Sequence, residues 1–569
     1  MRKRDAFNVI KNLFDRRTGA FTREGHELSE RDNFTVRDAY ISFVCLIVDL
    51  EYLELEEQKA QAGRIISDLC DRDLYDVLKA LAEVYSLCQE GTTLGFKALV
   101  SSISPQLWIL IRPDVERMKL GDAFAAKRLI QLAAYLSRLS LQDLSQEEQA
   151  INDYLATEEQ ILDVYPTSIT KALNRIIRFW LRDFDTSQIR FKHGPGSVAF
   201  VSPPTLENKY VHLGTDRKID IVFKDTYQPT VETLLSLECP SHVVEIDRRS
   251  ETTFVPKSWK TMRTISMESP TLMYLQQGIL AAIDHMVESN HYLKNRIGTH
   301  EQERNCLLAR QGSLFRDYGT VDLSAASDSV SWKLVKELFK GTVLYPYLIA
   351  TRSTHTVLPD GREVALKKFA PMGSALCFPI ETIVFASICE LVTRRWQYAS
   401  TEPGQFSGRY SVYGDDIICP TECVDDVISV LTQLGFSVNT GKSFWDADTW
   451  YRESCGGEYI DGFDVTPFRL SRGFKSVHEI SAVQQKIAGN TTGSGAMGYV
   501  DAANACFERG FMLLRCFYIQ KLVDHKITPF FGESGLNSFH ATNLHTKRRW
   551  HSDFQRTQVF CSDFVPMNN

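Results

Sequence analysis

The sequence lacks closely paired cysteines. Its 13 cysteines are scattered over 569 residues without a C-x2-C pair, and the nearest neighbours are Cys419 and Cys423. A structural zinc site needs closely spaced ligand pairs, so the pattern disfavours zinc-stabilised folds. Scattered cysteines in odd number fit a reducing compartment such as the cytoplasm.

A long apolar run is also lacking. The most apolar stretch near the N-terminus, residues 41–48, is interrupted by Asp49. A membrane-spanning helix needs about 20 predominantly apolar residues, so this stretch is too short to cross a bilayer. No signal peptide precedes it. We therefore expect a protein without a membrane partner.

The sequence also lacks an excess of positive charge. The formal net charge is −7, with 44% hydrophobic and 24% charged residues. These proportions are ordinary for a globular protein, and the length allows several subdomains around a large core. A net negative charge disfavours nonspecific binding of the whole protein surface to nucleic acid. Contact with a polyanion must therefore depend on local basic patches.

One such patch follows helical spacing. Basic residues recur at intervals of 4, 3 and 4, at Lys171, Arg175, Arg178 and Arg182. The other side of the same predicted helix is apolar, with Ile169, Ala172, Ile176 and Trp180. The pattern predicts an amphipathic helix with a basic face. Such a face can line an RNA path, lie on a membrane or simply be solvated.

The most informative residues are Tyr-Gly-Asp-Asp at 413–416, which stand between two apolar runs. Gly414 can adopt the positive φ of a tight hairpin turn, with Asp415 and Asp416 at its tip. Adjacent carboxylates repel each other unless a cation lies between them. In polymerases, a pair of Mg²⁺ ions roughly 3.5–4 Å apart occupies such a site. An ordinary acidic turn is the alternative.

A third carboxylate lies upstream. Residues 318–321 predict a short strand that leads to Asp322, and residues 330–339 predict a helix. Mg²⁺ prefers hard oxygen ligands and few protein groups, which Asp322, Asp415 and Asp416 would supply. Asp328 stands just before the predicted helix, where it can cap the helix, recognise a ribose, or do both.

Two further segments are candidates for nucleotide contact. Gly373 and Ser374 lie before a mostly apolar predicted helix, and a glycine there would let the backbone approach a nucleic-acid strand. The same pattern suits a plain loop before a buried helix. A basic segment carries Lys257, Lys260 and Arg263. These side chains can gather on a triphosphate or form a solvated loop.

Together these segments resemble one family. Residues 320–329 (Thr-Val-Asp-Leu-Ser-Ala-Ala-Ser-Asp-Ser) and 452–456 (Arg-Glu-Ser-Cys-Gly) are much more specific than the Gly-Asp-Asp alone, and 255–257, 412–418 and 464–468 agree with them. The chain resembles the replicase β subunit, an RNA-directed RNA polymerase, of the small single-stranded RNA bacteriophages (the Qβ-like leviviruses). The resemblance covers roughly residues 250–470.

The resemblance implies an α+β right-hand polymerase fold, with an antiparallel palm sheet and helical N- and C-terminal parts. The expected organisation is a mainly helical region at 1–190, fingers at 191–320, a palm at 321–470, and a thumb with a C-terminal tail at 471–569. Within the first region, apolar residues from Leu74 to Tyr85 predict a helix capped by Asp71 or Asp73. Residues 502–522 also read as helical, followed by a loop-rich tail.

Roles for single residues follow from the same resemblance. Asp322, Asp415 and Asp416 would bind two catalytic Mg²⁺ ions, for which Mn²⁺ or Ca²⁺ can substitute. Lys442 matches a lysine proposed to protonate the departing pyrophosphate, although a lysine at a strand edge also protects against aggregation.

Nucleotide-binding roles follow in the same way, for Lys257, Lys260, Arg263, Asp328, Gly373 and Ser374. The basic residues would contact the triphosphate, and Asp328 lies near where the ribose 2′-hydroxyl is sensed. Many viral RNA polymerases carry a Thr and an Asn in the helix after the Gly-Ser loop. Here Cys377 and Glu381 stand in those places, which leaves a ribose contact from that helix open.

The family also implies partners and a location. These are template RNA and nucleoside triphosphates, bacterial elongation factors Tu and Ts, and a ribosomal RNA-binding protein on some templates, all in the host bacterial cytoplasm. Two other functions stay open. A reverse transcriptase commonly has an apolar residue where Gly414 stands, and a noncatalytic RNA-binding scaffold could retain a polymerase fold.

Overall fold

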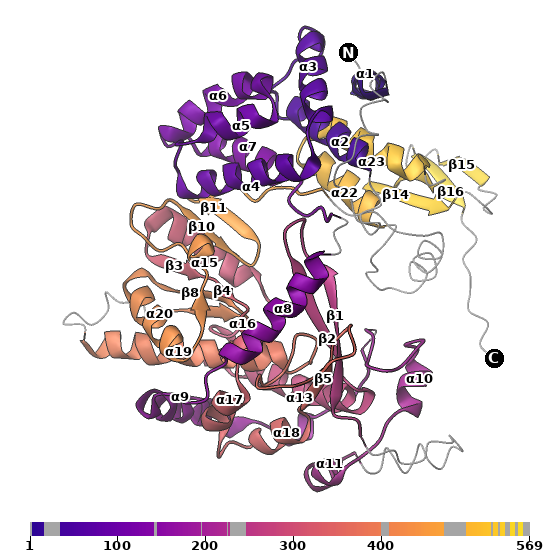
Figure 1. The fold of residues 1–569 in the computed structure, drawn as a ribbon. Helices are drawn as coiled ribbons and strands as arrows, with labels where there is room; N and C mark the ends of the chain where they lie inside the picture. Colours follow the sequence, from indigo (N-terminus) through magenta and orange to yellow (C-terminus); the bar gives the residue numbers. More distant parts are fainter. Residues whose placement is uncertain are drawn as a thin grey trace. The chain divides into compact units, whose positions relative to one another are not determined.

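In the computed structural model, the described residues are 3–15, 35–141, 145–194, 196–224, 226–227, 246–399, 409–470, 497–524, 527–532, 535–540, 547–551 and 556–560. The chain forms two compact units, whose elements are labelled in Figure 1. The first comprises Met1–Asp143, Pro256–Thr261 and Val465–Asn569, and the second comprises Leu144–Val255 and Met262–Asp464. The division into fingers, palm and thumb stays a prediction.

The first unit is mainly helical. Its N-terminal helices are α1 (Lys3–Asp15), α2 (Val36–Asp49), α3 (Lys59–Cys70), α4 (Leu74–Glu90), α5 (Phe96–Ile103), α6 (Pro105–Lys119) and α7 (Ala123–Ala134). Its C-terminal elements are α22 (Met497–Glu508), α23 (Met512–Asp524), β13 (Ile527–Gly532), β14 (Gly535–His540), β15 (Lys547–His551) and β16 (Arg556–Phe560). The expectation of a loop-rich tail is wrong for the described residues, because β13–β14 and β15–β16 form antiparallel hairpins.

Polar contacts hold the two ends of this unit together. Asp49, which interrupts the apolar run of α2, accepts hydrogen bonds from the backbone N–H groups of Leu513 (2.9 Å) and Leu514 (2.9 Å). N–H groups in the first turn of a helix have no acceptor within the helix itself. The Asp49 carboxylate therefore caps α23, and its negative charge interacts favourably with the helix dipole. Lys521 on α23 also forms a 3.0 Å ion pair with Asp38 on α2. The N- and C-terminal segments therefore fold as one unit.

The second unit mixes helices with short strands. Its helices are α8 (Ser145–Gln160), α9 (Thr167–Trp180), α10 (Leu206–Val211), α11 (Arg217–Val222), α13 (Pro270–Ser289), α14 (His291–Lys294), α15 (Glu303–Phe315), α16 (Ala326–Ser329), α17 (Trp332–Phe339), α18 (Tyr345–Ala350), α19 (Cys377–Ala399) and α20 (Val424–Gln433). Short 3-10 turns are η3 (Leu181–Asp183), η4 (Thr186–Gln188), η5 (Thr421–Cys423) and η6 (Thr440–Lys442).

Its strands form several small sheets. They are β1 (Arg249–Pro256), β2 (Met262–Met267), β3 (Tyr318–Val321), β4 (Leu323–Ser324), β5 (His355–Val357), β6 (Glu363–Ala365), β7 (Ser411–Tyr413), β8 (Asp416–Pro420), β9 (Ser437–Val438), β10 (Tyr451–Ser454), β11 (Gly457–Ile460) and β12 (Phe463–Asp464). The strand orders are β2-β1-β5-β6, β3-β8-β7, β10-β11-β12 and β4-β9. Strands β1 and β5 run parallel, whereas β3-β8-β7 is antiparallel.

The second unit has one large apolar core. Leu334 and Leu338 of α17, with Ile380 and Val384 of α19, are fully buried in it. These residues recur at helical spacing, so each helix turns one apolar face inward. The mostly apolar α19 confirms the helix predicted after the Gly-Ser loop. Its packing fixes the position of the β7–β8 turn. Among the described residues, no helix is both long and apolar enough to cross a membrane.

Candidate active site

The three predicted carboxylates lie at one end of the β3-β8-β7 sheet. Val321 pairs with Ile417 in antiparallel register, so the next residues, Asp322 and Asp416, lie opposite each other. Tyr413 pairs with Asp416 across the β7–β8 hairpin, which leaves Gly414 and Asp415 as its two-residue turn. The expected strand end and tight turn are confirmed.

The turn requires glycine for two reasons. Gly414 has a φ of +59°, a left-handed conformation that residues with a side chain rarely adopt. A Cβ placed there would also lie 2.7 Å from the ring of Phe378 on α19. The Gly414 N–H donates a 3.0 Å hydrogen bond to the Thr382 hydroxyl on the same helix. Helix α19 therefore holds the hairpin tip in place.

Asp416 is held by the β10–β11 hairpin. Its Oδ1 accepts hydrogen bonds from the Ser454 hydroxyl (3.1 Å) and the Cys455 backbone N–H (2.9 Å). Cys455 itself adopts the left-handed backbone conformation, with a φ of +51°. Asn305 on α15 donates to the Asp416 carbonyl oxygen at 3.1 Å. Burial raises the pKa of Asp416, with a contribution from Asp415, against these hydrogen bonds.

Asp322 is held from the other side by the segment after β9. The Asn439 side-chain amide donates to Asp322 Oδ2 at 3.0 Å, and Lys442 Nζ lies 3.7 Å from the same oxygen. The Asp322 N–H donates to the Ser443 hydroxyl at 3.0 Å. Burial raises the pKa of Asp322 to about 6, and the charges of Asp415 and Asp416 add to the effect, while Lys442 opposes it.

The chemical type of these donors suits a divalent cation. The three carboxylates are hard oxygen ligands, and a cation would offset both the burial of Asp322, which is the main cause of its raised pKa, and its repulsion by Asp415 and Asp416. In the part of the chain that the structure describes, no three His, Cys, Asp or Glu side chains converge closely enough to enclose a metal ion. Asp322 and Asp416 each give an oxygen to a protein donor instead. Coordination of one ion by all three would therefore need their side chains to move.

Two further acids border the site and were not singled out as ligands from the sequence. Glu453 on β10 has a pKa raised to about 7 by burial and by nearby Asp416, Glu458 and Asp322. Glu381 on α19 is buried, with a pKa raised to about 8 by burial, and it accepts a 2.6 Å hydrogen bond from the Ser327 hydroxyl. Glu453 lies in the Arg-Glu-Ser-Cys-Gly segment, so that motif was the available signal.

Asp328 does not cap the helix that follows it. Helix α17 begins at Trp332, and the Ser331 hydroxyl accepts from the Leu334 N–H as its N-cap. The capping hypothesis is therefore wrong, because Asp328 lies in the separate turn α16. Asp328 forms a 2.7 Å ion pair with Lys368, a fully buried lysine that also lies 3.1 Å from Glu158 on α8.

The Gly-Ser loop packs against the β2 strand. Gly373 has a φ of +128°, and a Cβ there would lie 2.1 Å from the Ser266 carbonyl oxygen. Ser374 is buried and donates to the Gln276 side chain at 3.0 Å. Gly373 also lines a cavity of about 470 Å³ with His193, Ser266 and residues of α13. Local packing accounts for both residues, and their nucleotide contact stays a prediction.

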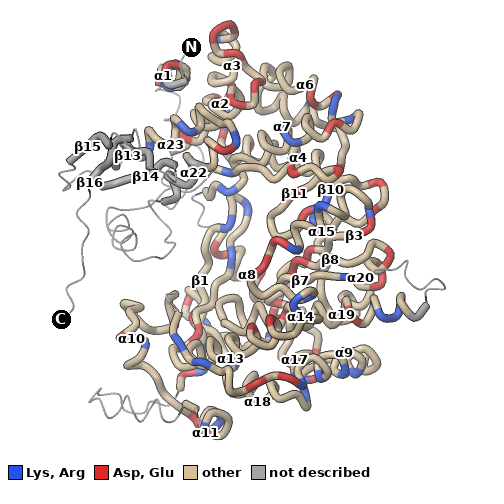
Figure 2. Tube along the Cα trace, turned by 180° about the vertical axis from the view of Figure 1, so that it is seen from behind, with Lys and Arg blue, Asp and Glu red and all other residues tan. Residues whose placement is uncertain are grey.

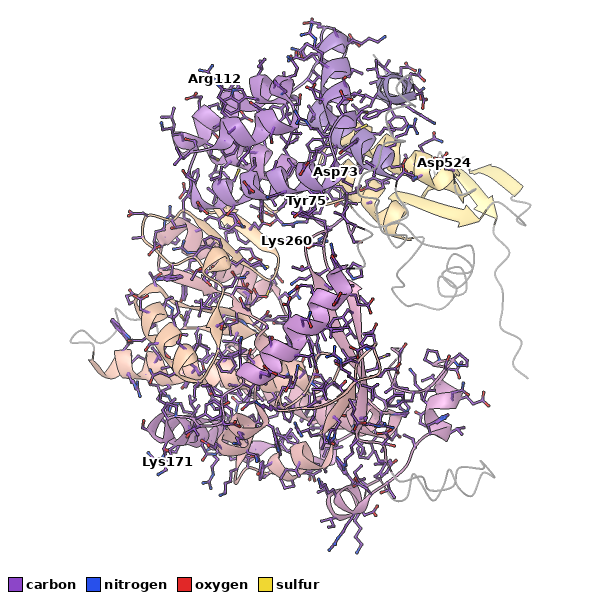
Figure 3. The ribbon with its side chains drawn as sticks, in the orientation of Figure 1. Asp73, Tyr75, Arg112, Lys171, Lys260 and Asp524 are labelled. Atoms are coloured by element: carbon purple, nitrogen blue, oxygen red, sulfur yellow. The ribbon has the colours of Figure 1, made fainter. Side chains whose placement is uncertain are left out.

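The basic segment spans the β1–β2 connection. Lys257 and Lys260 are exposed in the part that belongs to the first unit, whereas exposed Arg263 lies on β2 in the second. Trp259 between the lysines is buried, and its ring meets that of Tyr75 on α4 edge to face, 5.3 Å between centroids. Figure 3 labels Tyr75 and Lys260, the residue after Trp259. The tip is thus anchored to the helical unit, and convergence of the three cations on a triphosphate stays a prediction.

Comparison with known proteins places the chain in a family. A family model described as RNA replicase, beta-chain, matches residues 121–498. The chain belongs to this family. It is 36% identical over 249 residues to the RNA-directed RNA polymerase subunit beta of Enterobacteria phage SP, a match that covers 43% of this chain and 40% of the relative. The RNA-directed RNA polymerase beta chain of Escherichia phage MS2 is 34% identical over 235 residues, 41% of this chain and 40% of the relative.

These matches therefore span about 40% of the length of the curated relatives. Among solved structures, the chain is similar to the RNA-dependent RNA polymerase of a human picorbirnavirus, with a TM-score of 0.37 and 12% identity over 68% of this chain and 76% of that one. A chain described as an RdRp complex gives a TM-score of 0.44 at 10% identity over 84% of this chain and 48% of that one.

Proposed function

We propose that this chain is the catalytic β subunit of a phage replicase, an RNA-directed RNA polymerase that copies a single-stranded RNA genome by two-metal nucleotidyl transfer. The observation that carries the proposal is the meeting of Asp322, directly after β3, with Asp416, the first residue of the neighbouring antiparallel strand β8, and with Asp415 in the β7–β8 turn. The family membership and the names of its phage relatives support it. The sheet and its turn would be the palm of a right-hand fold.

Two bound Mg²⁺ ions would activate the 3′-hydroxyl of the growing strand and stabilise the charge on the leaving pyrophosphate. Asp322, Asp415 and Asp416 would hold them. Asn439 and Ser454 orient two of these carboxylates before any ion binds. Lys442 lies beside Asp322 with its side chain 54% exposed. From this position it would donate a proton to the departing pyrophosphate.

Nucleotide binding is assigned to the basic segment and to Asp328. Lys257, Lys260 and Arg263 would contact the triphosphate, which carries no base information. Asp328 would accept a hydrogen bond from the ribose 2′-hydroxyl, with its carboxylate fixed by Lys368 at 2.7 Å. A reverse transcriptase commonly has an apolar residue where Gly414 stands, and here the left-handed backbone of Gly414 and the neighbouring Phe378 ring leave no room for one.

Partners and location are proposed from the family resemblance. The chain would act on template RNA and nucleoside triphosphates in the host bacterial cytoplasm, assembled with elongation factors Tu and Ts. A ribosomal RNA-binding protein would assist on some templates. A net charge of −7 gives a physical motive for borrowed RNA-binding surface.

The test is template-dependent incorporation by the chain co-purified with its host factors, with ribonucleotides and deoxyribonucleotides supplied separately. We expect Mg²⁺-dependent RNA synthesis that Asp322→Ala or Asp415→Asn abolishes without loss of the fold. Asp425→Asn, an exposed acid on α20, is the matched control and should stay active. Synthesis only from deoxyribonucleotides would indicate a reverse transcriptase, and RNA binding without any incorporation would indicate a noncatalytic scaffold.

A further inference from the structure

The basic face of α9 is not used by the carboxylate site. Lys171, Arg175 and Arg178 are exposed on this helix, and exposed Arg182 follows on η3. Figure 2 shows the cluster of basic positions along α9, and Figure 3 shows Lys171 extending away from the protein. Between residues 167 and 183 the single acidic residue is Asp183, which pairs with Arg182 at 3.3 Å. This is a concentrated positive surface on a net acidic chain.

The opposite side of α9 is committed to the protein core. Leu173, Ile177 and Trp180 are buried in the large apolar cluster of the second unit. Asn174 donates from its side-chain amide to the carbonyl oxygens of Leu338 (2.8 Å) and Lys340 (3.1 Å), at the end of α17. An interfacial membrane helix needs a free apolar face to bury among lipids. Helix α9 has none, so its cations are presented on a rigid support.

An exposed aromatic ring lies among these cations. Phe179 is 53% exposed, and the Arg182 guanidinium lies 4.4 Å from its ring centroid. The Arg178 guanidinium rests beside Gly341, where a Cβ would lie 3.6 Å from its central carbon. Phosphates of a duplex need only the cations, whereas unpaired bases can also stack on an aromatic ring. The combination of cations and an exposed ring therefore favours a single strand.

We propose that Lys171, Arg175, Arg178, Phe179 and Arg182 form a binding surface for single-stranded RNA. The cations hold the phosphate backbone, and Phe179 stacks with one base. The cations extend about 10 Å along α9 from Lys171 to Arg178, and Arg182 on η3 continues the row beyond the end of the helix. This surface gives the net acidic chain an RNA-binding site of its own, separate from the carboxylate site.

Fluorescence anisotropy of a labelled unstructured RNA of about 12 nucleotides tests the proposal, over a range of salt concentrations. The variant Lys171→Gln/Arg175→Gln/Arg178→Gln removes three charges from α9. Its matched control, Lys97→Gln/Lys119→Gln/Lys127→Gln, removes three exposed charges from the first unit. A third variant, Phe179→Ala, removes the ring alone. Thermal unfolding confirms that each variant is folded.

We expect the α9 variant to bind more weakly, with a salt slope smaller by about 2, from roughly 0.7 per phosphate contact. Phe179→Ala should weaken binding about tenfold at an unchanged salt slope, because stacking releases no counterions. An equal loss in the matched control would overturn the proposal, since net charge alone would then explain the binding.

Two competing occupants are tested in parallel, with a hairpin duplex of equal length and with vesicles containing anionic lipid. A preference for the duplex, insensitive to Phe179→Ala, would overturn single-strand binding. Vesicle binding that the α9 variant abolishes, without any effect on RNA, would assign the surface to a membrane instead. RNA binding does not require catalysis, so the two proposals can fail separately. If the chain binds RNA in the expected pattern but synthesises none, the proposed function is wrong and the binding surface stands.

Discussion

Single acidic residues of the candidate site are held near one another against their mutual repulsion. Burial raises the pKa of Asp322 to about 6, of Glu453 to about 7 and of Glu381 to about 8. The folded protein therefore retains protons on these groups that the unfolded chain would lose, so ionising them opposes folding. A cation at Asp322 would offset part of this cost.

Lys368 is the residue that should decide sugar selection. The double variant Lys368→Met/Glu158→Gln removes the buried cation and one of its two partners, and leaves Asp328 without its ion pair. We expect the preference for ribonucleotides over deoxyribonucleotides, measured as the ratio of kcat/KM values, to fall about tenfold, the scale of one charged hydrogen bond. The neighbouring exposed Lys367→Met is the control. An unchanged ratio in an active, folded variant would remove Lys368 from this role.

Glu268 gives a pH-dependent prediction away from the carboxylate site. It is buried, it accepts a hydrogen bond from the Ser353 hydroxyl, and burial raises its pKa to about 7. A raised carboxyl pKa means that the fold favours the neutral form, so stability declines as pH rises from about 4.5 towards 7. Glu268→Gln mimics the neutral form. It should match the wild type near pH 4.5 and exceed it by up to about 3 kcal/mol at pH 8.

Thermal or urea unfolding at several pH values measures this difference, with exposed Glu207→Gln as the control. The same gain at all pH values would show that titration of Glu268 is not its origin.

At the scale of elements, sequence patterns predicted the structure correctly where the stabilising hydrogen bonds and packing lie within or next to the same segment. Helix α4 begins after Asp73, whose side chain caps the Tyr75 N–H, and this decides between the two expected caps. The two-residue β7–β8 turn and the basic helix α9 also follow their patterns. The prediction that Asp328 caps a helix was wrong because its partner, Lys368, lies 40 residues away in the sequence. Proximity to a predicted helix start carried no information about that contact.

The contact of Asp49 with α23 is a testable link between distant elements. Asp49→Ala leaves the Leu513 and Leu514 N–H groups without their acceptor. We expect a loss of about 1–2 kcal/mol, the usual value of a helix cap. Hydrogen exchange should quicken in α23 and little in the second unit. Asp49→Asn keeps an oxygen acceptor and should lie close to the wild type, and equal losses in both variants would indicate charge rather than capping.

At the scale of the whole molecule, the chain is net acidic and divides into two units. The first unit joins N-terminal helices to the C-terminal segment and the β1–β2 tip, so no sequence-contiguous division describes it. The basic segment crosses the boundary, with Lys260 in one unit and Arg263 in the other.

Host assembly gives a prediction at this scale. We expect the isolated chain to be poorly soluble or inactive, and co-expression with elongation factors Tu and Ts to restore template-dependent synthesis. Purification from a bacterial host under increasing salt should retain both factors with the chain. Co-expression with either factor alone is the control. A chain that elutes alone, monomeric and fully active on a natural template, would refute host assembly and leave the polymerase proposal standing.

The sequence by itself determined the local features of the site: the strand before Asp322, the glycine turn, the helix after the Gly-Ser loop and the family. These depend on residues close together in the chain, whose spacing and backbone preferences can be read directly. Only the tertiary structure decided that Ser454 and Cys455 hold Asp416, that Asn439 holds Asp322, and that Lys368 pairs with Asp328. Such contacts join distant segments, and a polar residue's type fixes what it can bond, whereas packing of the whole fold selects its partner.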